Sequence, residues 1–276
     1  RRVCGGKNEI HSKMKRFISL SGGVESTTMC LLYGKGATAI FCDTGDEHRE
    51  LYERMDFLEE AMTHFHGGDF TLLRIKPNPK IKGQYVTRLS EGIKAFAFMP
   101  SPMARYCTSR FKIEPIEKFL KEQGECEVLI GFNADEQPGS VRIGNHEKLK
   151  NVTYRYPLYD DGYDRADCEA LLTKHGMHPN FPIYMSRGGC KFCFYKSKAE
   201  YKALYLLDLE TFMEGWNLEK SVQDRRKKYF SILPNTTFQA IADEVENEVA
   251  NWGEQAVIEF YRPQAQTKVC GVFCHR

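Results

Sequence analysis

The stretch that decides the fold is FISLSGGVEST, which covers residues 17–27. It predicts a short apolar strand, a turn with two glycines and the start of a helix that continues through TTMCLLYG. Backbone N–H groups in such a turn point at whatever lies above it, and the helix dipole adds partial positive charge. The hydroxyl groups of Ser21, Ser26 and Thr27 add donors without bulk. We therefore expect this turn to bind a phosphate or sulfate group, although an ordinary tight turn has the same pattern.

Strands and helices alternate along the first half of the chain. The predicted strands are RFISL, ATAIFC, FTLLRI and EVLIGF. One predicted helix covers residues 25–33, a second starts near Glu47 and a third covers residues 113–123. Such alternation implies a parallel sheet with helices on both faces. Ligands of these sheets bind beyond the carboxyl ends of the strands, where the glycine turn lies. The sequence thus predicts a three-layer α/β fold.

The pattern changes after about residue 158. Loops rich in Gly, Pro and Asn lead to a cysteine pair, and two long helical patterns follow over residues 196–226 and 236–252. We expect a leader, a nucleotide-binding α/β part and a helical, cysteine-bearing part that covers the ligand edge of the sheet. The bounds of these three parts are residues 1–13, 14–160 and 161–276.

The composition fits a cytoplasmic globular protein. The chain has 276 residues, of which 42% are hydrophobic, and a formal net charge of +2, so the overall charge does not require a nucleic-acid partner. No apolar run approaches the length of a membrane span, and we expect neither a membrane partner nor a secretion signal. Ten cysteines in a reducing compartment favour metal binding or redox chemistry over disulfides.

Polar side chains follow the second predicted strand. Asp43 and Thr44 come directly after ATAIFC, and Asp43 is suited to the ribose hydroxyls or adenine amine of a nucleotide or, together with Glu25, to Mg²⁺. An Asx-turn at Asp43 is equally consistent with the sequence. We expect Asp46 to cap the helix that follows and His48 to lie at the surface.

Two further segments concentrate charge. Residues 105–115, RYCTSRFKIEP, place three cations, a thiol and two hydroxyls at a helix entrance, which favours anion binding by Arg110 and Lys112. After the fourth strand, Asp135 and then Arg142 offer a carboxylate and a guanidinium to a polar ligand. A plain surface loop is equally consistent with Asp135.

The order of these motifs resembles the phosphoadenosine phosphosulfate (PAPS) reductase family. The matching motifs are SGGVEST, DTGDEH, CTSRFKIEP, GFNADEQ…SVR, YPLYD and RGGCKFC, spread over roughly residues 17–195. The resemblance implies a PP-loop fold, related to adenine nucleotide α-hydrolases, that acts on an adenosine nucleotide. Glu25 stands where the PP-loop SGGxDS usually has Asp. The residues that the resemblance assigns to the phosphate or phosphosulfate end are Ser21, Gly22, Gly23 and Ser26, with counter-charge from Arg110, Lys112 and Arg142.

The Cys190–Cys193 pair has the C-x₂-C spacing with which two thiolates chelate one metal centre, zinc included. In members that reduce adenosine phosphosulfate (APS), a Cys-Cys pair and a later C-x-x-C hold a [4Fe–4S] cluster. By that resemblance Cys107, Cys190 and Cys193 are ligands here, while Tyr106 replaces the remaining cysteine of the first pair. The fourth ligand is then Cys270 or Cys274, or one iron is open, as in [4Fe–4S]-dependent thiolation enzymes. Zn²⁺ is the alternative to the cluster.

The chain ends on KVCGVFCHR, which loosely resembles the Lys-x-Glu-Cys-Gly motif of the reductases. In that motif the cysteine attacks the sulfur of the substrate, which implies that Cys270 is the nucleophile. Val269 replaces the Glu of the motif, and Cys274 is an additional cysteine.

Three functions compete. The first is a thiol-dependent reductase that converts PAPS or APS to sulfite, with a thioredoxin-like thiol as partner. The second is an ATP-dependent, iron–sulfur-dependent sulfurtransferase that takes sulfur from a donor and thiolates nucleic acid, as DNA phosphorothioation and tRNA thiolation enzymes do. The third is a nucleotide-binding module without chemistry. A homo-oligomer is compatible with each of them.

Overall fold

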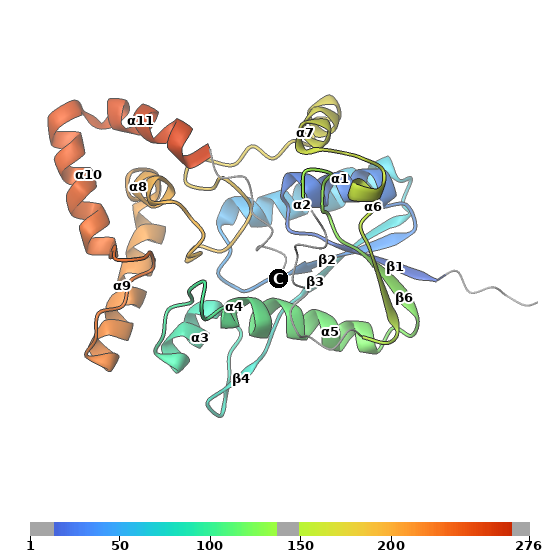
Figure 1. Ribbon diagram of the computed structural model, residues 1–276, viewed down its shortest axis with the longest axis horizontal. Helices are drawn as coiled ribbons and strands as arrows, with labels where there is room; N and C mark the ends of the chain where they lie inside the picture. Colours follow the sequence, from blue (N-terminus) through green and yellow to red (C-terminus); the bar gives the residue numbers. More distant parts are fainter. Residues whose placement is uncertain (1–13, 137–148, 267–276) are drawn as a thin grey trace, which may run out of the picture.

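The structure, a computed structural model, describes residues 14–136 and 149–266 and is built on a five-stranded parallel sheet (Figure 1). The strand order is β3-β2-β1-β6-β7, and every neighbouring pair is parallel. The strands are β1 (Lys15–Ser19), β2 (Ala37–Cys42), β3 (Phe70–Ile75), β6 (Cys126–Leu129) and β7 (Val152–Arg155). The first four are the predicted strands, and the predicted α/β fold is confirmed.

Strand β1 lies in the middle of the sheet. Phe17 faces Thr38 of β2 on one side and Val128 of β6 on the other. The chain runs from β1 outward to β2 and β3, and then returns to β6 on the opposite side of β1. The carboxyl end of β1 is therefore the point where the strand order reverses, which is where open α/β sheets bind their ligands.

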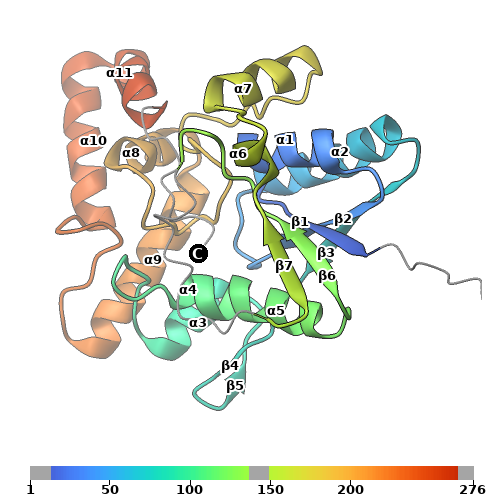
Figure 2. The ribbon, with the colours of Figure 1, turned by 45° about the vertical axis from the view of Figure 1, so that its right-hand side comes forward.

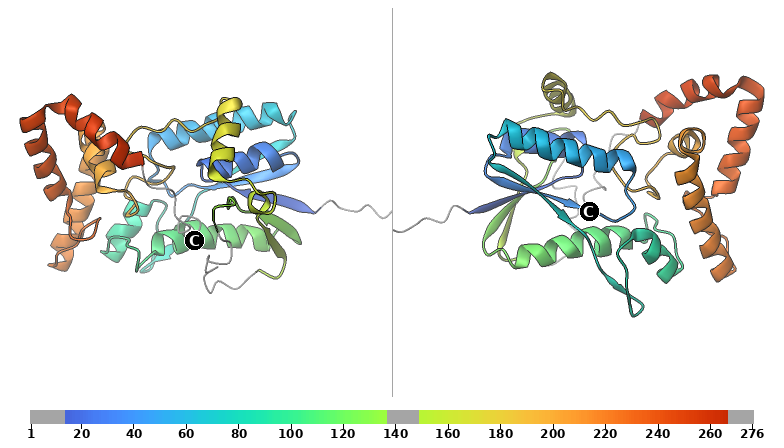
Figure 3. Two further views of the ribbon diagram at one scale, coloured as in Figure 1. Left: turned by 45° about the horizontal axis from the view of Figure 1, so that its top comes forward. Right: turned by 180° about the vertical axis from the view of Figure 1, so that it is seen from behind.

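Helices cover both faces of the sheet, as predicted. The helices α1 (Val24–Tyr33) and α2 (Arg49–Phe65) lie over one face, and α5 (Glu114–Lys121) lies over the other (Figure 3). The buried side of α2 carries apolar residues at helical spacing, which pack into the main hydrophobic cluster. These residues are Leu51, Met55, Leu58 and Met62.

The predicted helix at residues 113–123 starts earlier in the structure. Helical backbone begins at α4 (Tyr106–Thr108), widens into a π-helical turn η1 (Ser109–Ile113) and continues as α5. Pro115 has no N–H to donate to the carbonyl oxygen of Phe111, four residues before it. That oxygen instead accepts a hydrogen bond from the Cys42 thiol at 3.0 Å. The helical run is thereby tied to the end of β2.

A helical region stands beside the carboxyl ends of the strands (Figure 2). The predicted helix at residues 196–226 is two helices, because Asp208 leaves the helical conformation and its carboxylate caps the second helix at Thr211 N. One hydrophobic cluster extends from Ile18 of the sheet to Ala265 of the last helix. The helices of this region are α8 (Lys198–Leu207), α9 (Leu209–Arg226), α10 (Phe238–Trp252) and α11 (Glu254–Gln266).

The remaining elements are short. They are the hairpin of β4 (Lys80–Ile81) and β5 (Gln84–Tyr85), and the helices α3 (Leu89–Phe96), α6 (Pro157–Asp160) and α7 (Arg165–Lys174). Among residues 14–136 and 149–266, none of the helices has the length and apolar character that a membrane span requires.

Candidate functional site

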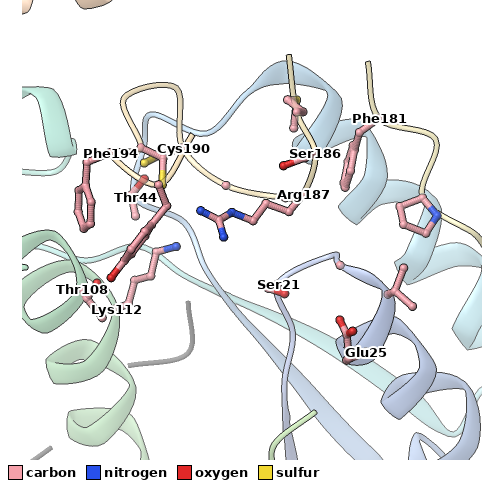
Figure 4. Close-up of a pocket in the computed structure, with 18 of the residues that line it drawn as sticks. Ser21, Glu25, Thr44, Thr108, Lys112, Phe181, Ser186, Arg187, Cys190 and Phe194 are labelled. Carbon is pink, nitrogen blue, oxygen red and sulfur yellow. The ribbon is translucent and has the colours of Figure 1, made fainter. Parts of the chain in front are cut away.

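A cavity of about 460 Å³ lies beyond the carboxyl ends of β1 and β2. Its walls come from the glycine turn, from the helical run that starts at α4, from α7 and from the loop between α7 and α8 (Figure 4). The polar and charged lining residues include Ser21, Glu25, Thr44, Arg105, Thr108, Lys112, Arg165, Glu169, Ser186 and Arg187, together with the thiols of Cys107, Cys190 and Cys193.

The glycine turn has the shape that the sequence predicts. Gly22 has a φ of +81°, and a Cβ there would lie 2.6 Å from the Cε of Met55, so the position requires glycine. The Ser26 hydroxyl accepts a hydrogen bond from Ser21 N and donates one to the Gly23 carbonyl, both at 3.2 Å. Ser26 therefore holds the turn in shape, while Ser21 and Gly23 line the cavity.

Glu25, at the start of α1, is bound by two other side chains of the protein. Its Oε1 atom accepts hydrogen bonds from Arg165 Nη1 at 2.5 Å and from Asn133 Nδ2 at 3.2 Å. Arg165 also binds Glu169 at 2.7 Å. The negative charge of Glu25 is therefore compensated by Arg165, which the sequence did not single out.

Asp43 lies outside the lining of the cavity. Its Oδ1 atom accepts hydrogen bonds from Gly45 N at 2.8 Å and from the Tyr52 hydroxyl at 2.7 Å. This is the Asx-turn that the sequence left open as the alternative. Thr44, the next residue, does line the cavity.

Two expectations after Asp43 are wrong. Asp46 does not cap α2, whose N-cap is His48. Instead the buried Asp46 carboxylate accepts hydrogen bonds from Ser90 N at 2.6 Å and from Arg88 Nη2 at 2.7 Å, and so holds the start of α3. His48 is not at the surface but 1% exposed, beside the ring of Tyr184.

The same loop pairs with the cysteine loop. Glu47 and Cys190 form an isolated antiparallel β-bridge, and Lys191 N donates to the Asp46 carbonyl at 2.8 Å. This pairing places the buried Glu47 carboxylate near Lys112 and Cys190, beside an inner chamber of about 100 Å³ that borders the cavity. The DTGDEH and RGGCKFC motifs therefore form one structural unit.

Lys112 is partly buried in the wall of the cavity yet remains protonated. Burial by itself lowers the pKa of Lys112, but the Glu47 carboxylate and the thiol groups of Cys190 and Cys193 outweigh it and raise that pKa. Burial raises the pKa of Glu47. The result is a fixed positive charge in the wall of the cavity, next to the cysteine pair.

The three cysteines of the cavity are not equivalent. The Cys190 thiol donates a hydrogen bond to Cys193, which lowers the pKa of Cys193 and raises that of Cys190. Arg187 and Lys196 lower the pKa of Cys193 further, so Cys193 is the more acidic thiol of the pair. Burial raises the pKa of Cys107, which lies near Cys193.

No three Cys, His, Asp or Glu side chains among the described residues are grouped closely enough to hold a single metal ion. Zinc, the alternative to the cluster, stays a prediction. The described thiols of Cys107, Cys190 and Cys193 do line one cavity, so the iron–sulfur ligand set stays a prediction.

The other predicted site residues are spread over several places. Thr27 is fully buried and its hydroxyl accepts from Arg54 at 3.3 Å. Arg110 is half-exposed and pairs with Glu114 outside the cavity, and Asp135 accepts a hydrogen bond from Arg165 N at 3.2 Å. Three further residues lie outside the described part of the chain, namely Arg142, Cys270 and Cys274.

The sequence analysis did not assign several lining residues to the site. Arg105 and Arg187 are the main cations among them, and an apolar wall at residues 179–183 contains Phe181 and two prolines. Arg187 did carry a signal, since it directly precedes the glycine pair of the C-x₂-C motif. Arg165 had none, because an arginine in an ordinary helical pattern does not indicate a ligand.

One family model and two curated relatives match this chain. A family model described as the phosphoadenosine phosphosulfate reductase domain matches residues 15–153. An uncharacterized 37.8 kDa protein of Escherichia phage 186 is 22% identical over 232 residues, which cover 68% of this chain and 69% of the phage protein. An uncharacterized protein of Methanocaldococcus jannaschii is 24% identical over 211 residues, which cover 74% of this chain but only 37% of that protein.

Solved structures are similar to part of this chain, and we describe one of them. It is the crystal structure of a PAPS reductase from Candida auris in complex with phosphate, which is 21% identical with a TM-score of 0.44. The match covers 61% of this chain and 76% of the Candida protein.

Proposed function

Because the chain belongs to the phosphoadenosine phosphosulfate reductase family, we propose that it is an enzyme that binds an adenosine nucleotide and reduces a sulfonucleotide, PAPS or APS, to sulfite. One observation carries the proposal. The glycine turn, the cations Lys112 and Arg187, and three cysteine thiols all line the same cavity. A glycine turn and cations suit the phosphosulfate end of the substrate, and the thiols lie around the same volume, which has a size that suits small ligands.

The reaction proceeds in two thiol steps. A cysteine thiolate attacks the sulfur of the sulfonate, an S–S bond forms, and the S–O bond to the phosphate breaks with its electron pair on the nucleotide. A second thiolate, from a thioredoxin-like partner, then attacks the cysteine sulfur. Sulfite leaves with the electron pair of the S–S bond, and the two thiols end as a disulfide. The two electrons that reduce sulfate sulfur to sulfite thus come from the two thiols.

The residues of this chain have distinct proposed roles. The turn at Ser21 and Gly23 binds the 5′-phosphate through backbone N–H groups at the start of α1. Lys112 offsets the charge that builds up on the leaving phosphate. Cys270 is the proposed nucleophile and lies outside the described residues.

In the decisive experiment, enzyme purified without oxygen is incubated separately with PAPS, APS and ATP in the presence of a thioredoxin-type reductant. The proposal expects sulfite from PAPS or APS, and its loss in Cys270→Ala. Cys30→Ala is the matched control, because Cys30 is buried in α1 away from the cavity. Pyrophosphate or AMP from ATP, with no sulfite from either sulfonucleotide, would overturn the reductase proposal.

The second candidate is an ATP-dependent sulfurtransferase that thiolates nucleic acid. The three thiols in one cavity favour it, since Cys107, Cys190 and Cys193 would hold a [4Fe–4S] cluster with one iron left for another ligand. When bound, such a cluster supplies an iron that carries sulfide. The measurement is the iron content of protein purified without oxygen. Cys190→Ser should abolish iron binding and the brown colour, while Cys30→Ser should retain both, and equal iron in the two variants would count against the cluster.

A further inference from the structure

Cations from two distant segments meet at the carboxyl end of α3. The Lys82 ammonium, in the turn between β4 and β5, and the Arg226 guanidinium, at the end of α9, both donate to the carbonyl oxygen of Phe96, at 3.4 and 3.1 Å. Arg225 donates to the carbonyl oxygen of Lys94, one turn earlier in α3, at 2.7 Å. These bonds hold the hairpin, α3 and the end of α9 together as one surface (Figure 2).

This surface concentrates positive charge. Residues 80–97 and 224–230 carry eight lysines and arginines but only two carboxylates. The whole chain has a formal net charge of +2, so the rest of the sequence is net negative. Arg88 is already paired with the buried Asp46. The other seven cations are exposed and define what we call the basic surface, namely Lys80, Lys82, Lys94, Arg225, Arg226, Lys227 and Lys228.

Two exposed tyrosines lie among these cations. Tyr85 of the hairpin is 69% exposed, and the Lys80 ammonium lies 5.7 Å from its ring centroid. Tyr229 directly follows the cations at the end of α9 and is 64% exposed. The next residue, Phe230, packs edge-on against Phe98 with 5.5 Å between the ring centroids, which holds this segment beside the end of α3. Exposed aromatic faces among cations suit a single strand, whose bases stack while its phosphates pair with the charges.

The end of α3 also contacts the wall of the cavity. The rings of Phe96 and Tyr106 lie 4.5 Å apart between centroids, and the Tyr106 hydroxyl donates to the carbonyl oxygen of Phe98. The sequence neighbours of Tyr106, Arg105 and Cys107, line the cavity. The residues that join the basic surface together therefore also pack on the segment that forms one wall of the cavity.

We propose that the basic surface binds single-stranded nucleic acid, with its lysines and arginines on the phosphates and with Tyr85 and Tyr229 stacked on bases. The net negative charge of the rest of the chain directs a polyanion to this surface. An acidic protein segment would match the charge, but it has no flat bases to cover the two tyrosine rings. The inference goes beyond the reduction of a small nucleotide and does not depend on it. A strand bound here would supply the acceptor that the second candidate function requires.

Fluorescence anisotropy of a labelled strand of about 20 nucleotides, titrated with the full chain, tests the surface. The probes are a DNA strand, an RNA strand and a DNA duplex. We expect micromolar affinity for a strand at about 50 mM salt, weaker binding of the duplex and a loss of affinity as the salt concentration rises.

Charge and stacking are tested by separate variants. The double variant Lys227→Gln/Lys228→Gln should weaken strand binding by about 3-fold to 30-fold. It should also reduce the slope of log K against log salt by about 0.7 for each phosphate contact that is lost. The double variant Lys227→Arg/Lys228→Arg keeps the charge and should bind as the wild type does. Tyr229→Ala should weaken strand binding by about fivefold or more.

The control is Lys35→Gln/Lys174→Gln, which removes the same charge from exposed positions after α1 and at the end of α7. It should bind a strand within about twofold of the wild type. Equal losses in the two Lys→Gln pairs would reduce the effect to overall charge and overturn the proposal, as would the absence of strand binding at about 50 mM salt. A duplex that binds as tightly as a strand, or unchanged strand affinity in Tyr229→Ala and Tyr85→Ala, overturns the assignment to a single strand.

The same proteins separate this inference from the proposed function. None of the seven cations lines the cavity, so the Lys227→Gln/Lys228→Gln variant should release sulfite from PAPS or APS at the wild-type rate. Strand binding without sulfite release would contradict the reductase and leave the basic surface in place. Sulfite release without strand binding would contradict the basic surface alone.

Discussion

At Gly188 the loop with the cysteine pair passes directly against the glycine turn. A Cβ at this position would lie 2.6 Å from the carbonyl oxygen of Ser21, a backbone atom that has little room to move. At the next residue, Gly189, a Cβ would have no atom within 4 Å. A side chain would therefore clash at Gly188 but not at Gly189, so the two adjacent glycines make a matched pair for mutation.

Gly188→Ala should push the cysteine loop away from the glycine turn. We expect it to destabilise the protein by about 1–3 kcal/mol and to weaken nucleotide binding, because the two walls of the cavity separate. Gly189→Ala should leave both quantities near wild type. Urea unfolding and nucleotide titration of the two variants check this, and equal behaviour of the pair would show that the contact is not needed.

At the residue scale, the sequence predicted the turn and the cysteine pair but not the environment of single polar residues. Asp46 and His48 lie in a segment whose local pattern is that of a helix start. Their actual partners, Ser90 and Tyr184, come from remote parts of the chain. Local sequence contains no information on such contacts, so capping propensity gave the wrong partner for Asp46.

Glu219 of α9 ties together elements of the helical region. Its carboxylate accepts hydrogen bonds from Ile232 N at 2.9 Å and from Phe238 N at 3.0 Å, and it is 2% exposed. Phe238 is the first residue of α10. One buried carboxylate thus fixes the connection between two helices.

The stability of this region should depend on pH through Glu219. Burial raises the pKa of Glu219 to about 7, above its usual value of 4.5, so the folded state binds a proton more tightly than the unfolded state. The stabilising effect of that proton is complete below about pH 4.5 and is lost as the pH rises to about 7, with a total of at most on the order of 3 kcal/mol.

Urea unfolding of the wild-type protein and Glu219→Gln between pH 4.5 and 7.5 measures this effect. The free energy of unfolding of the wild type should fall relative to that of Glu219→Gln over this interval. Glu60→Gln, a change at an exposed position, is the control and should follow the wild type. Parallel curves for the wild type and Glu219→Gln would mean that the carboxyl titrates at its ordinary pKa.

At the element scale, the strands and the first two helices were predictable, because apolar periodicity is a local signal. The break in the predicted helix at residues 196–226 was not, since Asp208 lies between two leucines that continue the helical pattern. The π-helical turn was not predictable either, because apolar periodicity does not tell a π-helical turn from an α-helical one, and its Phe111 carbonyl accepts a hydrogen bond from the remote Cys42. Both features arise from contacts that the periodicity does not encode.

At the scale of the whole molecule, the walls of the cavity combine the edge of the sheet with the loop that leads into the helical region. A nucleotide that binds there should therefore stabilise the entire fold. At a hundredfold excess over its dissociation constant, it should add about 2.7 kcal/mol to the free energy of unfolding. For a chain of this size we expect the melting temperature to rise by about 5 °C or more.

Thermal unfolding with APS, PAPS or ATP checks this, with Gly188→Ala as the variant whose shift should be smaller at the same nucleotide concentration. The absence of any shift at millimolar concentrations of all three nucleotides would contradict binding in the cavity.

The β-bridge between Glu47 and Cys190 has a consequence for how this chain varies and how it can be engineered. The hydrogen bond from Lys191 N to the Asp46 carbonyl joins the cysteine loop to the segment after β2. A graft of residues 186–196 from another protein would meet a foreign backbone at residues 46–47 unless that segment is transplanted too. We expect the two segments to be exchangeable between proteins only together, because the backbone of each one pairs with the backbone of the other.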